Sequence, residues 1–405
     1  MAKYNPFRPG SIIHPGMFAG RGGELMVMER ALYQTSNGNP THFLIHGERG
    51  IGKSSFLFLF NHIARGHVES LENKKYTFLT INIELEPNDD YAEIVAKVAR
   101  ELQRELDRDQ AVKKLLKELW DFVSNWRVLG VEYKRDSNPP VKAMLEELGD
   151  KLVAIASAIS QERQGIYIFI DEADKPPVEA GLGEFVKMLT ERLTKRGANN
   201  VGLGIIGISN VIPKMKESHE SSIRILTPIQ LEPLLADDRK EVVRRGLTEA
   251  RKKNSFDVTI TEGAIELIAD LSEGYPHFIQ QYAHSSFDHD SDNKIDVTDV
   301  KDALLKENGA LQLLGQRYFE NMYTDELRSD DYRTVLQVIA RHMPGYVSPG
   351  QITTESGLKR HTVNNALAAC KKRGSVIPRS GHVGQYCLPS RSFAVWIQAF
   401  KIAKE

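Results

Sequence analysis

The sequence predicts an α/β protein whose parallel sheet is followed by a bundle of helices and then by a small basic unit. Three observations support this architecture. Short apolar strands alternate with amphipathic helices up to Ile208, which is typical of a mainly parallel sheet with helices on both faces. From Asp237 onward the strand patterns stop, and four helical patterns follow one another. Residues 325–405 then show three helices and a hairpin.

Length and composition limit the class of protein. The chain has 405 residues, 41% of them hydrophobic and 26% charged, which is the profile of a globular chain with two or three domains. Its longest apolar runs, Phe56–Phe60 and Ile166–Ile170, are too short to span a bilayer. The first twenty residues lack the basic and apolar regions of a signal peptide, so the expected location is the cytoplasm. Cys370 and Cys387 do not have the spacing of a metal or redox pair.

The first part of the chain predicts strands separated by helices. Residues 1–16 are rich in Pro and Gly and are expected to form an extended arm. The strand patterns cover Thr41–His46, Phe78–Leu85, Ile166–Ile170 and Val201–Ile208. The helical patterns cover Lys53–Ala64, Tyr91–Leu106, Ala111–Asn125, Leu145–Gln161 and Phe185–Lys195. This alternation assigns residues 17–235 to one sheet domain.

A glycine-rich turn joins the first strand to the first helix. Residues 47–54 read GERGIGKS and match the pattern G-x-x-x-x-G-K-[ST]. A chance match is the alternative, but the strand before the turn and the helix after it favour a phosphate-binding loop. Lys53 is expected to contact the β- and γ-phosphates of a nucleotide, and Ser54 to ligate Mg²⁺ at the helix N-terminus. The predicted nucleotide-binding residues of this loop are Gly47, Glu48, Arg49, Gly50, Ile51, Gly52, Lys53, Ser54 and Ser55.

Two later strands end in residues suited to hydrolysis. The strand 166–170 is followed by Asp171, expected to hold Mg²⁺ through water, and by Glu172, expected to polarise the attacking water. A carboxylate at position 172 implies hydrolysis as well as binding. The strand that ends at Ile208 is followed by Ser209 and Asn210. Asn210 is expected to orient the water or sense the phosphate, and its alternative role is to cap a turn.

A helical bundle follows the sheet. Its helical patterns cover 237–253, 262–271, 276–288 and 297–307, which assigns residues 236–308 to this bundle. The segment 288–296, DHDSDNKID, resembles a calcium loop only superficially, because Asn293 and Asp299 stand where such a loop has Gly and Glu. A solvated acidic loop is the expected structure. Residues 309–324 predict a linker helix.

Residues 325–405 predict a winged helix, in which three helices are followed by a hairpin. The helices are predicted over 331–342, from Ser348-Pro349 to Gly357, and over 360–373, and the strands over 375–377 and 384–388. Val363, Leu367 and Cys370 give the third helix an apolar face. Because the unit has apolar helix faces of its own, it is expected to fold by itself.

The net charge of −1 is unevenly distributed along the chain. Residues 333–405 hold eleven Lys and Arg against two acidic residues, a net charge of +9, whereas the remainder carries −10. Such a split favours an anionic partner over a merely solvated surface, and duplex DNA is the expected partner. Docking of another protein is the alternative role of a winged helix. The predicted DNA-binding residues are Arg360, Asn364, Asn365, Lys371, Lys372 and Arg379.

These motifs together resemble the AAA+ class, and in particular archaeal origin-recognition initiator ATPases and the related archaeal STAND-type ATPases. FAGRGGEL at residues 18–25 is similar to the GR-x-x-E-L box that lies near the adenine, which implies nucleotide contacts for Gly20 and Arg21. GERGIGKSS, IFIDEAD and IIGISN are similar to Walker A, Walker B and sensor 1. The resemblance implies a P-loop base, a lid formed by residues 236–308, and an arginine finger before the lid. Arg224 is the expected finger, and its alternative role is that of a surface arginine or of a partner in a salt bridge at the sheet edge.

The lid motif departs from the initiator pattern. Initiators carry a sensor 2 arginine, whereas residues 273–279 read EGYPHFI and are similar to the G-x-P motif of STAND-type ATPases. His277 is expected to contact a phosphate in place of the arginine, or else to cap the helix after Pro276. Residues 126–133 resemble an extra hairpin of the archaeal STAND-type branch.

The resemblance implies a slow, Mg²⁺-dependent ATPase that binds ATP, assembles with further copies of itself and binds DNA as a nucleotide-controlled switch. The alternative is a STAND-type signalling ATPase that regulates a separate effector protein, for example a nuclease in antiviral defence. The sequence shows no nuclease, protease or transferase constellation, so such an effector would be a separate chain. A third alternative is a scaffold that holds ADP permanently.

Overall fold

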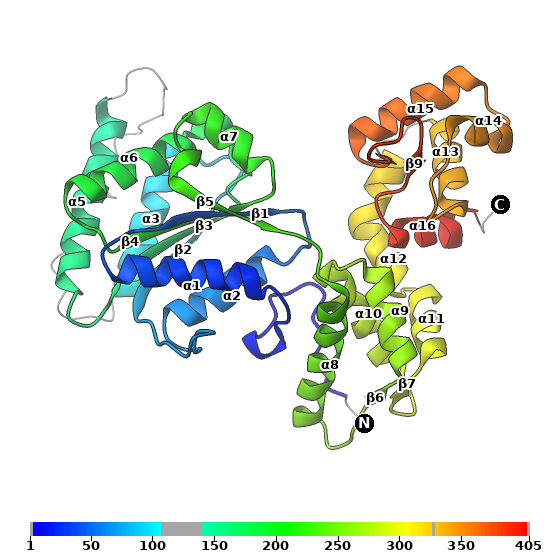
Figure 1. Cartoon of the computed structure of the whole chain (residues 1–405), viewed down its shortest axis with the longest axis horizontal. Coiled ribbons are helices and arrows are strands. Elements are labelled where there is room, and N and C mark those ends of the chain that lie inside the picture. The colour runs from blue at the N-terminus through cyan, green and yellow to red at the C-terminus, as the bar shows by residue number, and fades with distance from the viewer. Residues whose placement is uncertain (1–2, 107–138, 326–328, 403–405) are drawn as a thin grey trace. The chain divides into compact units, whose positions relative to one another are not determined.

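The structure is a computed structural model that describes residues 3–106, 139–325 and 329–402 (Figure 1). The chain divides into two compact units. Residues 21–232 form the first, here called the base unit, and residues 1–20 together with 233–405 form the second, here called the lid–wing unit. The chain passes from one unit to the other twice, at Gly20–Arg21 and at Glu232–Pro233.

The base unit is built on a sheet of parallel strands. They are β1 His42–Gly47, β2 Phe78–Glu84, β3 Gly165–Asp171, β4 Val201–Gly207 and β5 Leu226–Leu231, in the spatial order β2-β3-β4-β1-β5. The patterns that predict β1 to β4 are confirmed within one or two residues. No pattern predicts β5, because Thr227, Pro228 and Gln230 interrupt its apolar run. As an edge strand paired with β1, β5 tolerates a proline that a central strand would not.

Helices cover both faces of this sheet (Figure 1). α2 Lys53–Ala64 and α3 Tyr91–Leu106 have the predicted bounds, whereas α5 Pro139–Ala158 and α6 Leu182–Lys195 begin earlier than predicted. α1 Gly22–Ser36 and α7 Val211–Ser218 are not predicted by any pattern. The helix expected over 111–125 and the hairpin expected over 126–133 lie outside the described residues.

Large apolar side chains fill the space between the sheet and the helices. On one face, the ring of Phe43 in β1 lies 5.6 Å from that of Phe60 in α2 and 6.1 Å from that of Phe169 in β3. On the other face, apolar side chains of α3, α5 and α6 pack against strand residues such as Leu44 and Ile168. Both faces of the sheet are buried, which explains why its central strands read as nearly continuous apolar runs.

The lid–wing unit contains the predicted bundle of helices. Its members are α8 Ala236–Lys253, α9 Glu262–Ser272, α10 Pro276–His289 and α11 Val297–Leu305, here called the lid helices. The expectation that strands stop at residue 237 is wrong, because β6 Thr259–Ile260 and β7 Lys294–Ile295 form a short parallel pair. Strands of two residues are too short to show a periodic pattern.

The acidic segment 288–296 is held by specific contacts. Asp296 and Asp299 form a capping box at the N-terminus of α11. The buried carboxylate of Asp290 lies 2.5 Å from Nζ of Lys3, at the start of the chain. Three carboxylates of this region thus serve as a helix cap and as the partner of a lysine.

The N-terminal arm packs on the lid helices. Phe7 is buried, its ring lies 6.2 Å from that of Phe287 in α10, and it leaves no room for a side chain at Gly246 of α8. The backbone N–H of Arg8 donates a hydrogen bond to the side chain of Gln280. The arm is therefore a fixed part of the lid–wing unit.

The C-terminal part is a winged helix, as predicted. α13 Asp330–Arg341, α14 Pro349–Ser356 and α15 Arg360–Arg373 are followed by the antiparallel hairpin of β8 Ile377–Pro378 and β9 Tyr386–Cys387. Ser348 caps α14 in a capping box with Gln351, and Gly357 ends the helix with a left-handed φ of 69°. A further helix, α16 Arg391–Ile397, is not predicted; it continues into the turn Gln398–Ile402.

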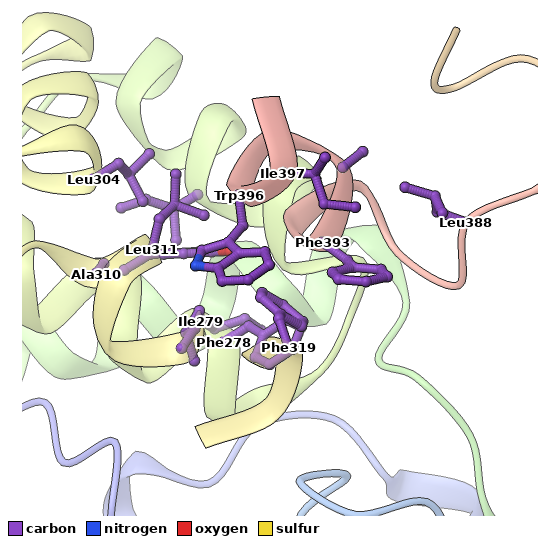
Figure 2. Close-up of a cluster of buried hydrophobic side chains, with 14 of the residues drawn as sticks. Phe278, Ile279, Leu304, Ala310, Leu311, Phe319, Leu388, Phe393, Trp396 and Ile397 are labelled. Carbon is purple, nitrogen blue, oxygen red and sulfur yellow. The ribbon is translucent and has the colours of Figure 1, made fainter. Parts of the chain in front are cut away.

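The lid helices and the winged helix share one hydrophobic core (Figure 2). Residues 309–324, expected to form a linker helix, form α12 Ala310–Leu314 and part of two π-helical turns, Gly315–Phe319 and Asn321–Asp325. Their apolar side chains belong to this core. Residues 325–405 therefore share their core with the lid helices.

Candidate functional site

The loop between β1 and α2 is shaped by its glycines. Gly50 and Gly52 have φ angles of 80° and 96°, in the left-handed region that other residues rarely adopt. Gly47 has no room for a side chain, because an added Cβ would lie 2.8 Å from the carbonyl oxygen of Leu231. The loop can therefore turn tightly from the end of β1 into the N-terminus of α2.

The N-terminus of α2 is suited to an anion. Its N-cap residue is Gly52, so no capping side chain accepts hydrogen bonds from the first turn. Lys53 adds a positive charge here, and its Nζ donates hydrogen bonds to the carbonyl oxygens of Gly47 and Glu48, at 3.0 and 2.9 Å. A glycine-lined turn, an uncapped helix N-terminus and a lysine fit the phosphates of a nucleotide.

Carboxylates lie near this lysine at the same edge of the sheet. Burial lowers the pKa of Lys53, and the negative charges of Asp174, Asp171 and Glu172 oppose that shift. Burial raises the pKa of Asp171, whose Oδ1 accepts a hydrogen bond of 2.8 Å from the N–H of Glu172. The structure thus brings together Lys53, Asp171 and Glu172, which the sequence predicts to act at one site.

Glu172 has an unusual backbone conformation and an ionic partner. Its φ of 53° is rare for a residue other than glycine. Its side chain is 42% exposed, and its carboxylate lies 3.9 Å from Nζ of Lys175, which donates a hydrogen bond of 3.1 Å to Glu84. Glu84 is paired with Asp171 in the register of β2 and β3. Sequence reasoning missed Lys175 and Glu84, because strand pairing brings Glu84 to the site across a long stretch of chain.

Asp174 holds two loops of the site together. Its Oδ1 accepts a hydrogen bond of 2.9 Å from the N–H of Ile208, and Lys214 of α7 donates to the carbonyl oxygens of Asp174 and Pro176. The segment after β3, which carries Glu172, is thereby tied to the segment after β4. This role is also missed by the sequence patterns.

Asn210 and Arg224 are exposed. Asn210 precedes α7 but its side chain makes no capping hydrogen bond, so its alternative role as a turn cap is not supported. Arg224 lies in the short 3-10 helix Ile223–Ile225, where its side chain is 74% exposed and 3.8 Å from Glu220. So loose an ion pair contributes little free energy, which leaves Arg224 able to contact another molecule.

Arg21 holds the phosphate loop from the side of α1. It is the N-cap residue of α1, with a φ of 65°, and its side chain is only 5% exposed. Its Nη2 donates a hydrogen bond of 3.1 Å to the carbonyl oxygen of Ile51, and its Nη1 lies 3.2 Å from Glu24. Arg21 therefore positions the backbone of the loop, a role that the sequence does not show.

Ser54 and Asp171 are the predicted Mg²⁺ ligands. Ser54 is exposed in the first turn of α2, and Asp171 ends β3. A hydroxyl and a carboxylate are oxygen ligands of the kind that Mg²⁺ takes, and the ion fills its other positions with water and phosphate oxygens. The donor set therefore fits this ion.

Gly20 and His277 belong to the lid–wing unit. Gly20 has a φ of 74°, and an added Cβ would meet Asp238 of α8. Burial, together with the charge of Arg317, lowers the pKa of His277 to about 4, so the imidazole is neutral at pH 7. Its buried Nε2 has no hydrogen-bond partner among the described residues.

The predicted DNA-binding residues lie on α15 and on the wing. Their side chains are exposed, whereas the opposite face of α15 is buried through Val363, Leu367 and Cys370. On the wing, Arg379 lies 5.2 Å from the ring of Tyr346 and donates a hydrogen bond to Gln385. No Asp or Glu occurs between residues 356 and 404, so the basic charge of this face has no acidic neighbour in its own segment. The predicted DNA-binding residues on α15, all exposed, are Arg360, Asn364, Asn365, Lys371 and Lys372.

The sheet and the phosphate loop define a P-loop nucleotide-binding fold. The family model of the AAA ATPase domain matches residues 17–196, so this part of the chain is similar to an AAA ATPase domain. The predicted AAA+ fold is thereby confirmed. No helix among the described residues is long and apolar enough to cross a membrane.

Several solved structures are similar to this chain over almost its whole length. The ORC1 protein of Aeropyrum pernix in complex with DNA is 16% identical, with 96% of this chain and 94% of that chain covered and a TM-score of 0.44. The ADP form of the ORC2 protein of Aeropyrum pernix is 12% identical, with 98% and 96% covered and a TM-score of 0.49. Cdc6p of Pyrobaculum aerophilum is 12% identical, with 98% of both chains covered and a TM-score of 0.43. No protein with a curated description matches the sequence.

Proposed function

We propose that the chain is a Mg²⁺-dependent ATPase of the AAA type whose nucleotide state controls the binding of duplex DNA by its winged helix. The observation that carries this proposal is that one chain holds two sites of complementary chemistry. The base unit has a phosphate loop with Glu172 near Lys53. The lid–wing unit has an exposed, basic helix α15 in a segment without acidic residues.

Each predicted site residue named below, all of them in the base unit, has a defined part in this proposal. Bound ATP supplies the phosphoanhydride bond that water cleaves. Lys53 balances the phosphate charge, and Ser54 and Asp171 hold Mg²⁺. Glu172 accepts the proton of the attacking water, and Asn210 orients that water. Arg21 keeps the loop in place through the carbonyl oxygen of Ile51.

Self-assembly is the second part of the proposal, and a substitution of Arg224 tests it. An exposed arginine can complete the site of a neighbouring copy. Arg224→Ala should then leave nucleotide affinity intact but lower ATPase turnover. When it is mixed with Glu172→Gln protein, some activity should return, because one mixed interface combines an intact arginine with an intact base. Steady-state phosphate release measures both effects.

A matched control is Lys216→Ala, which removes an exposed cation of α7 and should leave turnover unchanged. Subunit exchange is verified with labelled protein. Absence of recovery at every mixing ratio, with exchange verified, would contradict a site shared between two copies.

DNA binding by α15 predicts a graded response to substitution in the full chain. Lys371→Glu combined with Lys372→Glu should weaken binding to all duplex sequences alike, and each lost phosphate contact should lower the slope of log affinity against log salt by about one. Asn365→Ala should weaken binding selectively for some sequences, if Asn365 contacts a base edge. Fluorescence anisotropy at several salt concentrations measures both effects.

Lys252→Glu with Lys253→Glu is the matched control, because these exposed lysines occupy the last turn of another helix, α8. This pair should leave DNA affinity nearly unchanged. Failure of the wild-type chain to bind duplex DNA at low salt would remove the proposed DNA switch. Co-purification of an effector protein in that case would favour the STAND-type alternative, with the winged helix as a docking module.

A further inference from the structure

Aromatic side chains join the winged helix to the linker and the lid helices (Figure 2). The ring of Phe319 in the linker lies 5.2 Å from Phe393 and 6.0 Å from Trp396, both in α16. On its other side it lies 6.0 Å from Phe278 of α10. Phe319 is 3% exposed and Phe393 is fully buried. Aromatic packing of this kind links three segments that the sequence patterns assign to separate units.

The linker has a shape that fits α16. A Cβ added at Gly315 would overlap the indole ring of Trp396. The backbone of the first π-helical turn therefore lies directly against this ring, and a hinge at Gly315 would have to open the packed core. Because protein interiors are close-packed, such an opening has a large cost in free energy.

Polar contacts fix the N-terminus of α16 to the lid helices. The buried hydroxyl groups of Tyr282 and Ser392 are within hydrogen-bond distance, and Ser392 Oγ also donates to the carbonyl oxygen of Leu271. The N–H of Arg391 donates a hydrogen bond of 2.6 Å to the carboxylate of Glu273. An N–H in the first turn of a helix needs such an acceptor, and a carboxylate is a favourable one.

Glu273 and Gly274 form a strained turn between two elements. Their φ angles are 50° and 88°, and the carbonyl oxygen of Gly274 accepts a hydrogen bond of 2.9 Å from the N–H of Leu234. Leu234 directly follows the point, Glu232–Pro233, where the chain leaves the base unit. The segment that enters the lid–wing unit and the last helix of the winged helix are thus bonded to the same turn.

We infer that the lid helices and the winged helix move as one rigid body, so that a displacement of the lid by nucleotide carries α15 with it. This inference rests on the proposed function only for its consequence, the control of DNA binding. The hinges are then the two places where the chain passes between the units, Gly20–Arg21 and Glu232–Pro233, and not residues 309–324. Arg21 adjoins the first of these hinges and is bonded to the phosphate loop, so a change in that loop is transmitted directly to it.

Distances between labels in the full chain test the rigid body. The background is Cys370→Ala with Cys387→Ala, which removes both native thiols. Exposed positions receive cysteines: Lys301→Cys on α11, Thr354→Cys on α14 and Lys216→Cys on α7. Paired spin labels are measured without nucleotide, with ADP and with a slowly hydrolysed ATP analogue. The pair Lys301→Cys and Lys252→Cys, both on lid helices, serves as the reference. It gives the width of the distance distribution that is expected within a rigid unit.

The distribution of lid-to-wing distances, from position 301 to 354, should be as narrow as that of the reference pair. Its mean should not change with nucleotide. The base-to-wing distance, from 216 to 354, should shift between the nucleotide-free and analogue-bound states. A lid-to-wing distance that is broad, or that shifts with nucleotide, would overturn the rigid body. A base-to-wing distance that never shifts would overturn the transmission. Neither measurement needs DNA or hydrolysis, so failure of the DNA switch is a separate result.

A variant that weakens the contact between α16 and the lid helices tests whether the rigid body couples nucleotide to DNA binding. Glu273→Ala with Ser392→Ala removes the polar contacts of α16 but leaves the aromatic core, and it should broaden the lid-to-wing distance. Coupling between two sites typically changes affinity about 5- to 150-fold, and in this variant the effect of nucleotide on DNA affinity should be largely lost. Glu262→Ala, an exposed lid carboxylate paired with Arg244, should retain the effect. An unchanged effect of nucleotide in a loosened variant would contradict the inference.

Discussion

The Lys53→Ala chain is expected to bind ATP and ADP at least ~100-fold more weakly than the wild-type chain. Hydrogen bonds to charged groups contribute about 1.5–3 kcal/mol each, and 1.4 kcal/mol corresponds to a factor of ten in affinity. Lys53 lies at the uncapped N-terminus of α2, where the glycine-lined loop offers backbone N–H groups and one other cation, Arg49, but no second lysine. Isothermal titration calorimetry with each nucleotide measures the loss.

Two controls separate lost charge from lost structure. Nζ of Lys53 also bonds to the carbonyl oxygens of Gly47 and Glu48, so its removal releases part of the loop. Thermal unfolding without nucleotide reports that effect by itself. Lys75→Ala removes an exposed lysine of the same unit and should leave affinity unchanged. Nucleotide affinity within a few-fold of wild type in Lys53→Ala would contradict the assignment of the phosphate loop.

Local patterns predict the phosphate loop and its flanking elements well. The motif GERGIGKS is complete within eight consecutive residues. The bounds of α2 agree with those predicted from the apolar pattern of its sequence. The same holds for α15, whose buried face is given by Val363, Leu367 and Cys370. Such features depend on neighbours in the sequence, so the sequence alone contains the information that defines them.

Other elements lack a usual local signal. The N-cap residue of α1 is Arg21, which has a left-handed backbone conformation. Arginine is not one of the common N-cap residues, so the start of α1 has no usual sequence signal. β5 has a proline and alternating polar residues, and it is a strand because β1 offers it an edge. α16 is different, because Ser390 is a good N-cap and its side chain accepts from the N–H of Phe393. The signal for α16 was therefore present, but the helix is short.

Contacts between distant segments account for the rest of what sequence patterns do not predict. The bond from Arg21 to the phosphate loop and the meeting of Lys175 with Glu84 depend on tertiary structure. The shared core of lid helices and winged helix depends on α16 returning to the linker. A basic charge and apolar helix faces indicate a winged helix, but they do not show whether its core is its own.

Glu172→Gln is expected to retain nucleotide affinity and to lower ATPase turnover by about 10²-fold or more, which is the usual contribution of a general base. Glutamine has nearly the same size as glutamate and can keep the backbone conformation at φ 53°, so Lys53, Ser54 and Asp171 stay in place. Only the group that accepts the proton is lost. Calorimetry and steady-state phosphate release, made on the same sample, separate binding from turnover.

The structure also limits which other residue can replace Glu172. Asp174 is the nearest alternative base in the sequence, but its Oδ1 accepts the N–H of Ile208 and thereby holds the loop after β4. Asp174→Asn should therefore lower thermal stability, while Glu86→Gln, an exposed carboxylate nearby, should change neither turnover nor stability. Turnover that is unchanged in Glu172→Gln but lost in Asp174→Asn, with stability retained, would transfer the role of base to Asp174. Lys175 lies 3.9 Å from Glu172, so Glu172→Gln also removes one ion-pair partner of Lys175, which keeps its hydrogen bond to Glu84.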